Sequence, residues 1–256
     1  VSTLFFCYFC AMKKVILSAV SILCFGMLLN AQNATTTGSK KLDLTGRPAD
    51  HFVLEFQNIS LFGKPDSVKT SGFSRGFNIY FMYDKPFATN PKFSLSFGGG
   101  LGTSNIFFDN KTYVDVKSTA NTLPFRSIDA ASNHFSKFKL TTIYLEAPVE
   151  LRYYSDPVHP NSSWKTSIGL KLGTLLKAYS KGKNMVSSTG ASINGKSYIE
   201  KEQSKRFFNA TNVAVSGKIS YGIFGISVTQ NLTPLLRDSY GPVMHKFAVG
   251  FTISGL

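Results

Sequence analysis

The chain has 256 residues, enough for one domain with a full core but not for two of ordinary size. It carries 28 Lys and Arg against 14 Asp and Glu, and it is rich in Phe (23), Tyr (11) and Gly (21). Abundant aromatic and glycine residues with few charges favour an all-β protein and argue against a helical bundle.

The first 31 residues predict a signal peptide that directs export. Residues 12–14 (Met-Lys-Lys) give a positive start, residues 15–29 are apolar, and Ala31 precedes Gln32 as a cleavage site. The apolar stretch is too short for a convincing membrane-spanning helix. Residues 1–11 lie upstream of a good start at Met12, so we interpret them as untranslated, with an extended leader as the alternative.

Cleavage after Ala31 would remove every cysteine, namely Cys7, Cys10 and Cys24. The mature chain would then hold neither a disulfide nor a cysteine-ligated metal. Residues 32–49 are polar and rich in Thr, Ser, Lys and Gly, which predicts a flexible periplasmic lead-in before a folded domain at 50–256.

From residue 50 onward, apolar and polar residues alternate with the period of two that is typical of β-strands. Phe93 and Leu95, for example, take one side of the chain, whereas Ser94 and Ser96 take the other. Tilted strands of about 9–11 residues cross the hydrocarbon layer of a membrane, and nearly all of these segments are long enough. We therefore expect an eight-stranded antiparallel up-and-down barrel with strands at 50–61, 72–84, 92–108, 138–154, 164–180, 207–221, 223–235 and 244–254.

The connections between these strands differ in length in a regular way. Numbered along the chain, the even ones are short: residues 85–91, residues 155–163 and a tight turn at Gly222. Two of the odd ones, residues 109–137 and 181–206, are long. Outer-membrane barrels alternate in this manner, with short turns in the periplasm and long loops outside. The pattern predicts a transmembrane barrel in the cell outer membrane.

The polar face of the predicted strands carries small residues among a few charges, as suits the narrow lumen of an eight-stranded barrel. The predicted lumen charges are Glu55, Glu146, Glu150, Arg152, Lys171 and Lys218, and Lys177 has the same parity as Lys171. We expect Glu146 and Lys171 to pair, because they lie at similar depths on neighbouring strands. Charges away from water need partners, so a network that fills the lumen is favoured over a proton or anion path, and no open pore is expected.

Aromatic residues of apolar parity mark the predicted periplasmic rim: Phe52, Tyr83, Phe93, Tyr153, Trp164 and Tyr221. Such girdles are expected where amphipathic rings lie among lipid headgroups. Charges of the same parity, such as Arg75 and Lys139, occur only near the predicted outer rim. The apolar face is therefore expected to meet lipid. The rival interpretation is a soluble, lipocalin-like ligand binder, whose apolar face would point inward.

Four segments carry a resemblance to a known family: GFSRGF at 72–77, GGGLGTSN at 98–105, YLEAPVELRY at 144–153 and GLKLG at 169–173. Through them the chain resembles the Bacteroidota outer-membrane β-barrel family that includes PorT-like proteins, over about residues 50–254. The resemblance implies an outer-membrane barrel. Relatives that act as accessory subunits of type IX protein secretion supply one alternative function. The chain departs from many barrels in lacking a terminal Phe.

No catalytic constellation emerges, and we expect no enzymatic activity, cofactor or metal. A barrel enzyme needs a histidine near a serine or carboxylate at the outer rim. Of the four histidines, His51, His134, His159 and His245, only His245 is reasonably placed. No pair of His, Asp or Glu has metal-ligand spacing. The glycines at 98–102 lie inside a strand with no following helix, which argues against a phosphate-binding loop.

Basic residues gather in the two long loops and at their rims. As a hypothesis, they bind lipopolysaccharide phosphates in the outer leaflet, and the expected contacts are Lys137, Lys139, Lys201, Lys205 and Arg206. The alternative is an ordinary solvated loop surface. The predicted partners are outer-membrane lipid and lipopolysaccharide, the barrel-assembly machinery during insertion, and an unidentified envelope protein, but no nucleic acid. The predicted role is structural, surface-interacting or accessory.

Overall fold

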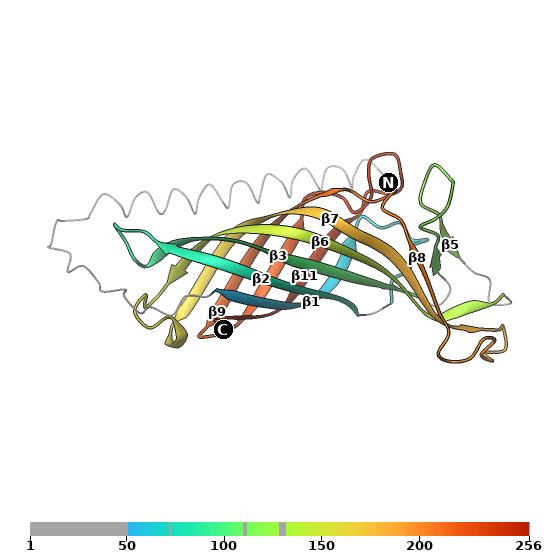
Figure 1. The fold of residues 1–256 in the computed structure, drawn as a ribbon, viewed down its shortest axis with the longest axis horizontal. Coiled ribbons are helices and arrows are strands. Elements are labelled where there is room, and N and C mark those ends of the chain that lie inside the picture. Colours follow the sequence, from blue (N-terminus) through green and yellow to red (C-terminus); the bar gives the residue numbers. More distant parts are fainter. Residues whose placement is uncertain (1–50, 72, 110–111, 128–131, 256) are drawn as a thin grey trace. The chain divides into compact units, whose positions relative to one another are not determined.

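Eight strands close into an antiparallel ring in the computed structural model, which describes residues 51–71, 73–109, 112–127 and 132–255. Figure 1 shows these strands running side by side along the barrel. The predicted signal peptide at 1–31 and the lead-in at 32–49 lie outside the described residues. Among the residues that the structure describes, no helix is long and apolar enough to cross a membrane.

Each strand of the ring pairs with its predecessor in the ring, and the last pairs with the first. The ring consists of β1 (Phe52–Phe62), β2 (Ser74–Pro86), β3 (Phe93–Phe108), β6 (His134–Tyr154), β7 (Trp164–Val186), β9 (Thr211–Tyr221), β10 (Phe224–Asn231) and β11 (His245–Ser254). Outside the ring, β4 (Thr112–Val114) pairs with β5 (Phe125–Ser127), and β8 (Ile199–Gln203) pairs with the end of β7. The predicted eight-stranded up-and-down barrel is confirmed.

Two ring strands are longer than the alternation predicts. The strands expected at 138–154 and 164–180 continue to His134 and Val186, which are register partners at the end of the β6–β7 pair. Alternation of apolar and polar residues fades in this stretch, so the pattern does not reveal it. The strand expected at 223–235 is shorter and ends at Asn231, since Pro234 has no N–H to pair.

A β-bulge in β7 reverses the predicted direction of Lys177. Ile143 pairs with Lys177 and Tyr144 pairs with Leu175, which leaves Leu176 without a register partner on β6. One extra residue shifts the alternation of side chains, so Lys177 faces outward and is exposed. Uninterrupted alternation predicts an inward position, and that expectation is wrong for this reason.

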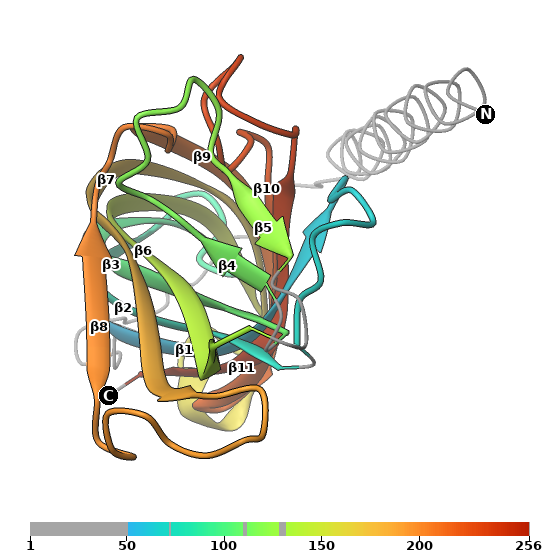
Figure 2. The same cartoon turned by 90° about the vertical axis from the view of Figure 1, so that its right-hand side faces the viewer.

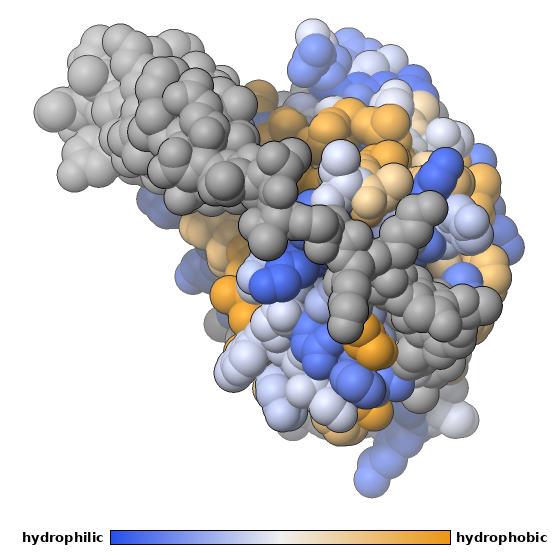
Figure 3. Space-filling model, turned by 90° about the vertical axis from the view of Figure 1, so that its left-hand side faces the viewer, coloured by the Kyte–Doolittle hydropathy of each residue, from blue (hydrophilic) through white to orange (hydrophobic). Residues whose placement is uncertain are grey.

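The apolar side of each ring strand faces outward. Leu145 and Leu170 are 52% and 50% exposed, whereas their chain neighbours Glu146 and Lys171 are 8% and 2% exposed. A soluble, lipocalin-like barrel requires the reverse arrangement, because its apolar residues line the interior. In Figure 3, which faces the end of the barrel with the short turns, hydrophobic side chains lie around the flank. Such a surface is suited to contact with lipid hydrocarbon.

The largest apolar core lies at the end of the barrel that carries the long connections. We call this group the cap core; its central members are Val114, Val116, Leu123, Phe135, Phe138, Phe207, Phe208, Leu235, Leu236 and Met244. All of them are buried, although several belong to segments that the sequence pattern predicts as loops. Figure 2 shows β4, β5 and β8 at this end, in front of the ring. The described parts of the long connections are therefore folded.

Candidate functional site

Ion pairs cross the lumen of the barrel and centre on one carboxylate. Glu55 of β1 is fully buried, and its carboxylate oxygens lie 2.7 Å from Lys171 Nζ and 3.1 Å from Lys218 Nζ. The two lysines belong to β7 and β9, which are not neighbours of β1 in the ring. These contacts therefore span the interior and tie opposite walls of the barrel together.

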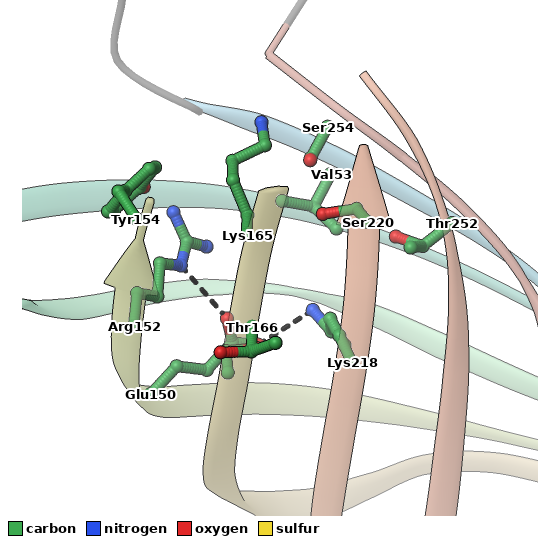
Figure 4. Close-up of a pocket in the computed structure, with 11 residues that line it drawn as sticks. Val53, Glu150, Arg152, Tyr154, Lys165, Thr166, Lys218, Ser220, Thr252 and Ser254 are labelled. Carbon is green, nitrogen blue, oxygen red and sulfur yellow. Dashed lines mark hydrogen bonds and ion pairs between the residues drawn. The ribbon is translucent and has the colours of Figure 1, made fainter. Parts of the chain in front are cut away.

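The ion-pair chain continues toward the end with the short turns. Lys218 Nζ also lies 2.6 Å from Glu150, whose other oxygen accepts a hydrogen bond from Arg152 Nε at 3.1 Å. Figure 4 shows both contacts at a small pocket that Lys165 and Tyr154 help to line. The predicted lumen residues on these strands are thus brought together.

A tyrosine separates the two residues that the sequence predicts to pair. The Tyr80 hydroxyl donates to Glu146 at 2.6 Å and accepts from Lys171 Nζ at 3.3 Å. Lys171 pairs with Glu55 instead of Glu146, because Tyr80 lies between the two and supplies the hydrogen bond that Glu146 needs. The expected Glu146–Lys171 ion pair is replaced by this relay.

Side-chain amides, which the sequence reasoning did not assign to the network, complete it. Asn78 donates to Glu55 at 2.9 Å, and Asn212 donates to Glu146 at 3.3 Å and accepts a hydrogen bond from Asn231. The signal available in the sequence was the inward parity of these amides, but parity alone does not identify a partner across the barrel. With them, polar contacts extend along most of the lumen.

Glycines on neighbouring strands make room for the buried carboxylates. A Cβ atom at Gly102 would lie 2.7 Å from the Glu146 carboxylate, and one at Gly169 would lie 2.8 Å from Cγ of Glu150. Real Cβ contacts are not so short, so the glutamate side chains occupy the space that these glycines leave. The abundance of glycine in the sequence thus has a packing role in the lumen.

The cap is joined to the barrel by polar contacts as well as by its core. The Tyr113 hydroxyl of β4 donates to Glu202 of β8 at 3.1 Å, and both burial and that carboxylate raise the pKa of Tyr113 above its ordinary value. Arg206 Nη1 donates to the Ser118 carbonyl at 3.1 Å, which joins the connection before β9 to the one after β4. Arg206 is exposed and donates to this neutral carbonyl, so its contact with lipopolysaccharide stays a prediction.

The other four predicted lipopolysaccharide residues divide into two groups. Three of them point outward: Lys137 and Lys139 of β6 and Lys201 of β8. Their register partners on β7, Lys183 and Lys181, have the outward parity of that strand. Lys205 lies in the connection that follows β8. Only the first group lies on one continuous sheet.

The predicted aromatic girdle lies on the outer surface at the end with the short turns. Its members are Phe52, Tyr83, Phe93, Tyr153, Trp164 and Tyr221. Phe93 and Tyr153 are register partners whose ring centroids lie 5.2 Å apart, and Trp164 and Tyr221 are partners 5.4 Å apart. The structure thus gathers four of these six rings in two cross-strand pairs. Their contact with lipid headgroups stays a prediction.

The histidines are dispersed. His51 Nδ1 lies 2.9 Å from the Met82 carbonyl, and His159 lies 3.1 Å from Asp156 in the exposed turn between β6 and β7. There the Val158 backbone N–H and His159 lower the pKa of the Asp156 carboxyl. In the part of the chain that the structure describes, no group of three His, Cys, Asp or Glu residues is placed to hold a metal ion.

Comparisons with known proteins place the chain in a family. The profile of a family described as "Outer membrane protein beta-barrel domain" matches residues 34–241. One similar solved structure is the crystal structure of Ail, the attachment invasion locus protein of Yersinia pestis, in complex with the heparin analogue sucrose octasulfate. Its sequence is 14% identical to this chain, and the TM-score is 0.33. The match covers 79% of this chain and 96% of the Ail chain. A second Ail structure is 13% identical, with a TM-score of 0.33 over 79% and 95% of the two chains. No curated protein matches the sequence. Because the profile covers most of the chain, this outer-membrane protein belongs to the outer membrane protein β-barrel domain family.

Proposed function

We propose that this protein is a closed, non-conducting barrel whose role is structural or surface-interacting, without catalytic activity. The observation that carries the proposal is the occupied lumen, in which Glu55, Lys171 and Lys218 join strands from opposite walls. An eight-stranded barrel has an interior that side chains can fill. The cap core adds an apolar layer beyond this network. Ions would have to break buried charge pairs to pass, which is costly.

Electrical recording in a planar lipid bilayer tests the closed lumen. The full-length protein is expected to give no stepwise conductance at either polarity, whereas an open porin in the same bilayer conducts. A variant with Glu55→Ala, Lys171→Ala and Lys218→Ala, which empties the centre of the network, provides the matched comparison. Porin-like steps from the unaltered protein would overturn the proposal.

The absence of catalysis is proposed from the placement of the histidines. His159 lies with Asp156 in an exposed turn, and His51 bonds a backbone carbonyl at the start of β1. Both lie at the end of the barrel with the short turns, away from the outer end where enzymes of this architecture would need a histidine beside a nucleophile. Incubation of the folded protein with lipid and peptide substrates should release no product above that of the heat-unfolded protein.

The outer surface is the proposed place of interaction. A folded cap held by the ring presents a defined surface to the outside, and outward lysines beside it suit the phosphates of lipopolysaccharide. Insertion is proposed to use the barrel-assembly machinery, as for other outer-membrane barrels. The narrower resemblance to PorT-like proteins of Bacteroidota, with an accessory role in type IX secretion, stays a prediction that pull-down of secretion components would test.

A further inference from the structure

Acidic side chains of the described strands keep to the inner side of the barrel wall, whereas basic side chains occur on both faces. The carboxylates carried by the described strands face the lumen or the interior of the cap: Glu55, Asp84, Glu146, Glu150, Glu200 and Glu202. At the cap end, the outward face of β2, β6, β7 and β8 carries cations instead. We call these the cationic strip: Arg75, Lys137, Lys139, Lys177, Lys181, Lys183 and Lys201.

Three lysines of the strip stand side by side. Lys139 of β6 is the register partner of Lys181 of β7, and Lys181 is in turn the partner of Lys201 of β8. In an antiparallel pair, opposite residues have Cβ atoms about 4.5–5.5 Å apart, and like charges there destabilise the sheet. Lys137 of β6 and Lys183 of β7 are also register partners, two residues further along each strand toward the cap. Pairing in this register therefore works against the stability of the free protein.

The contacts of these cations within the protein do not neutralise them. Lys201 Nζ lies 4.1 Å from the centroid of the Tyr179 ring, and Lys139 Nζ lies 5.7 Å from that of Phe107. Lys139 also donates to the Asn105 side-chain oxygen at 2.7 Å. Rings and amides orient a cation and leave its charge unchanged. Lys139 and Lys201 are thus oriented, and among the described residues no carboxylate forms a salt bridge with either.

The strip begins where the apolar surface ends. Outward residues of β6 are apolar or aromatic from Tyr153 to Ile143, a length that matches the roughly 9–11 residues with which a tilted strand crosses hydrocarbon. Lys139 lies two outward positions further on, and on β7 Lys177 directly follows the apolar Leu176. With the short turns in the periplasm, these cations lie at the level of the outer-leaflet headgroups.

We propose that the cationic strip is a binding site for the phosphate groups of an outer-leaflet lipid, the phosphomonoesters of lipopolysaccharide, with the row Lys139, Lys181 and Lys201 at its centre. The proposal deepens the lipid contact proposed above, rests on it, and does not depend on whether the lumen is closed. It differs from the loop-centred hypothesis, because its central row lies on the paired strands β6, β7 and β8 and not in the loops.

Because Lys181 lies between two other lysines, its replacement should change the stability of the fold in opposite directions with and without phosphate-bearing lipid. Without phosphate, replacing Lys181 removes repulsion and should stabilise the fold. With phosphate-bearing lipid, the same replacement removes an attraction. Each cation near a charged lipid surface is worth about 1 kcal/mol, which corresponds to about five-fold in affinity. A residue with only a structural role would change stability by the same sign in both environments.

The experiment uses the full-length protein refolded into phosphatidylcholine vesicles, alone or with bisphosphorylated lipid A, dephosphorylated lipid A or inorganic phosphate. The readout is the urea midpoint of unfolding. Bisphosphorylated lipid A should raise the midpoint of the unaltered protein, and the other two additions should not. Lys181→Met should raise the midpoint in phosphatidylcholine alone and gain less from lipid A, with affinity about five-fold weaker. Lys85→Met, an outward lysine at the opposite end of β2, is the matched control and should respond to lipid A like the unaltered protein.

Three outcomes would overturn the site. Equal stabilisation by dephosphorylated lipid A would show that the acyl chains act, not the phosphates. A full effect of inorganic phosphate alone would show a general anion site and remove the assignment to lipid. An identical response of Lys181→Met and Lys85→Met to lipid A would show that position in the strip is irrelevant. None of these results bears on conductance, so the closed-barrel proposal fails or stands separately.

Discussion

Individual charges in the lumen depend on partners that come from distant parts of the sequence. Glu55 meets Lys171 across the barrel at 2.7 Å, and Lys218 bridges Glu55 and Glu150. A buried pair of this kind contributes little net stability relative to a well-packed apolar pair. Loss of one partner, however, leaves a charge in the interior with no compensation. Single and double substitutions should therefore differ sharply.

Glu55→Gln should destabilise the barrel by about 3–5 kcal/mol, because it leaves Lys171 without its carboxylate. Combining it with Lys171→Met removes the orphaned charge and should recover a large part of the loss. Urea unfolding in lipid vesicles measures both. If the double variant were as unstable as the single one, the pair would not be the reason for the loss.

Among the strands, β7 shows how one element serves three environments. Its residues nearer the short turns alternate between lipid and lumen, with Leu170 outward and Lys171 inward. Its middle contains the bulge at Leu176, and its upper part extends past the membrane to pair with β8. Register must hold throughout, because a shift of one residue exchanges the two faces.

Leu170→Arg should destabilise the protein by about 2–4 kcal/mol, since it places a charge on the lipid face near the middle of the membrane. Lys177→Arg, also outward but beyond the apolar band, is the control and should be nearly neutral. Unfolding in vesicles of defined thickness measures both. Equal stability of Leu170→Arg and Lys177→Arg would contradict the assigned lipid face.

Deletion of Leu176 should leave the barrel folded, because Leu176 is the extra residue of the bulge and its loss restores regular alternation with Lys177 and Lys181 still outward. Deletion of Gly190, which lies in a loop with nothing within 4 Å of a built Cβ, is the control and should be tolerated. Heat-modifiable migration on a gel distinguishes folded from unfolded barrels. Loss of the heat shift after Leu176 deletion, with a normal shift after Gly190 deletion, would show that the barrel depends on the bulge.

At the scale of the whole molecule, the protein has two interiors of opposite character. Ion pairs and hydrogen bonds fill the part inside the membrane, whereas the cap core outside it is apolar like that of a soluble domain. The two interiors share strands, since Phe135 and Phe138 of the cap core belong to β6. Damage to the cap core should nevertheless spare the lower ring, whose pairing lies within the membrane.

Phe208→Ala should loosen the cap by about 3–5 kcal/mol, because Phe208 is fully buried there. Trypsin added to intact cells should then cut near Lys205 and Arg206, while the ring keeps its heat-modifiable migration. Ile193→Ala, at an exposed loop position, should leave the cap resistant. Simultaneous loss of the heat shift would show that cap and ring unfold as one unit.

The eight strands of the ring could be predicted from the sequence, because the features that determine them are local. Alternation, turn residues and strand length all derive from neighbouring residues, and Glu55 and Lys171 follow from parity alone. What could not be derived depends on contacts across the barrel or on the register of a pair. Tyr80 lies between Glu146 and Lys171, and the bulge moves Lys177 outward, yet neither leaves a mark in the alternation. The cap core was hidden because its apolar residues follow no period.

The closing pair of the ring has a consequence for chain order. Val53 near the start of β1 is the register partner of Ser254 at the end of β11, so the two ends of the barrel sequence lie next to each other. A short linker could join them without strain, and the chain could then be cut at the turn around Gly222. Such a circularly permuted chain would keep every strand neighbour of the original. The contacts of the folded ring therefore do not determine which strand comes first along the polypeptide.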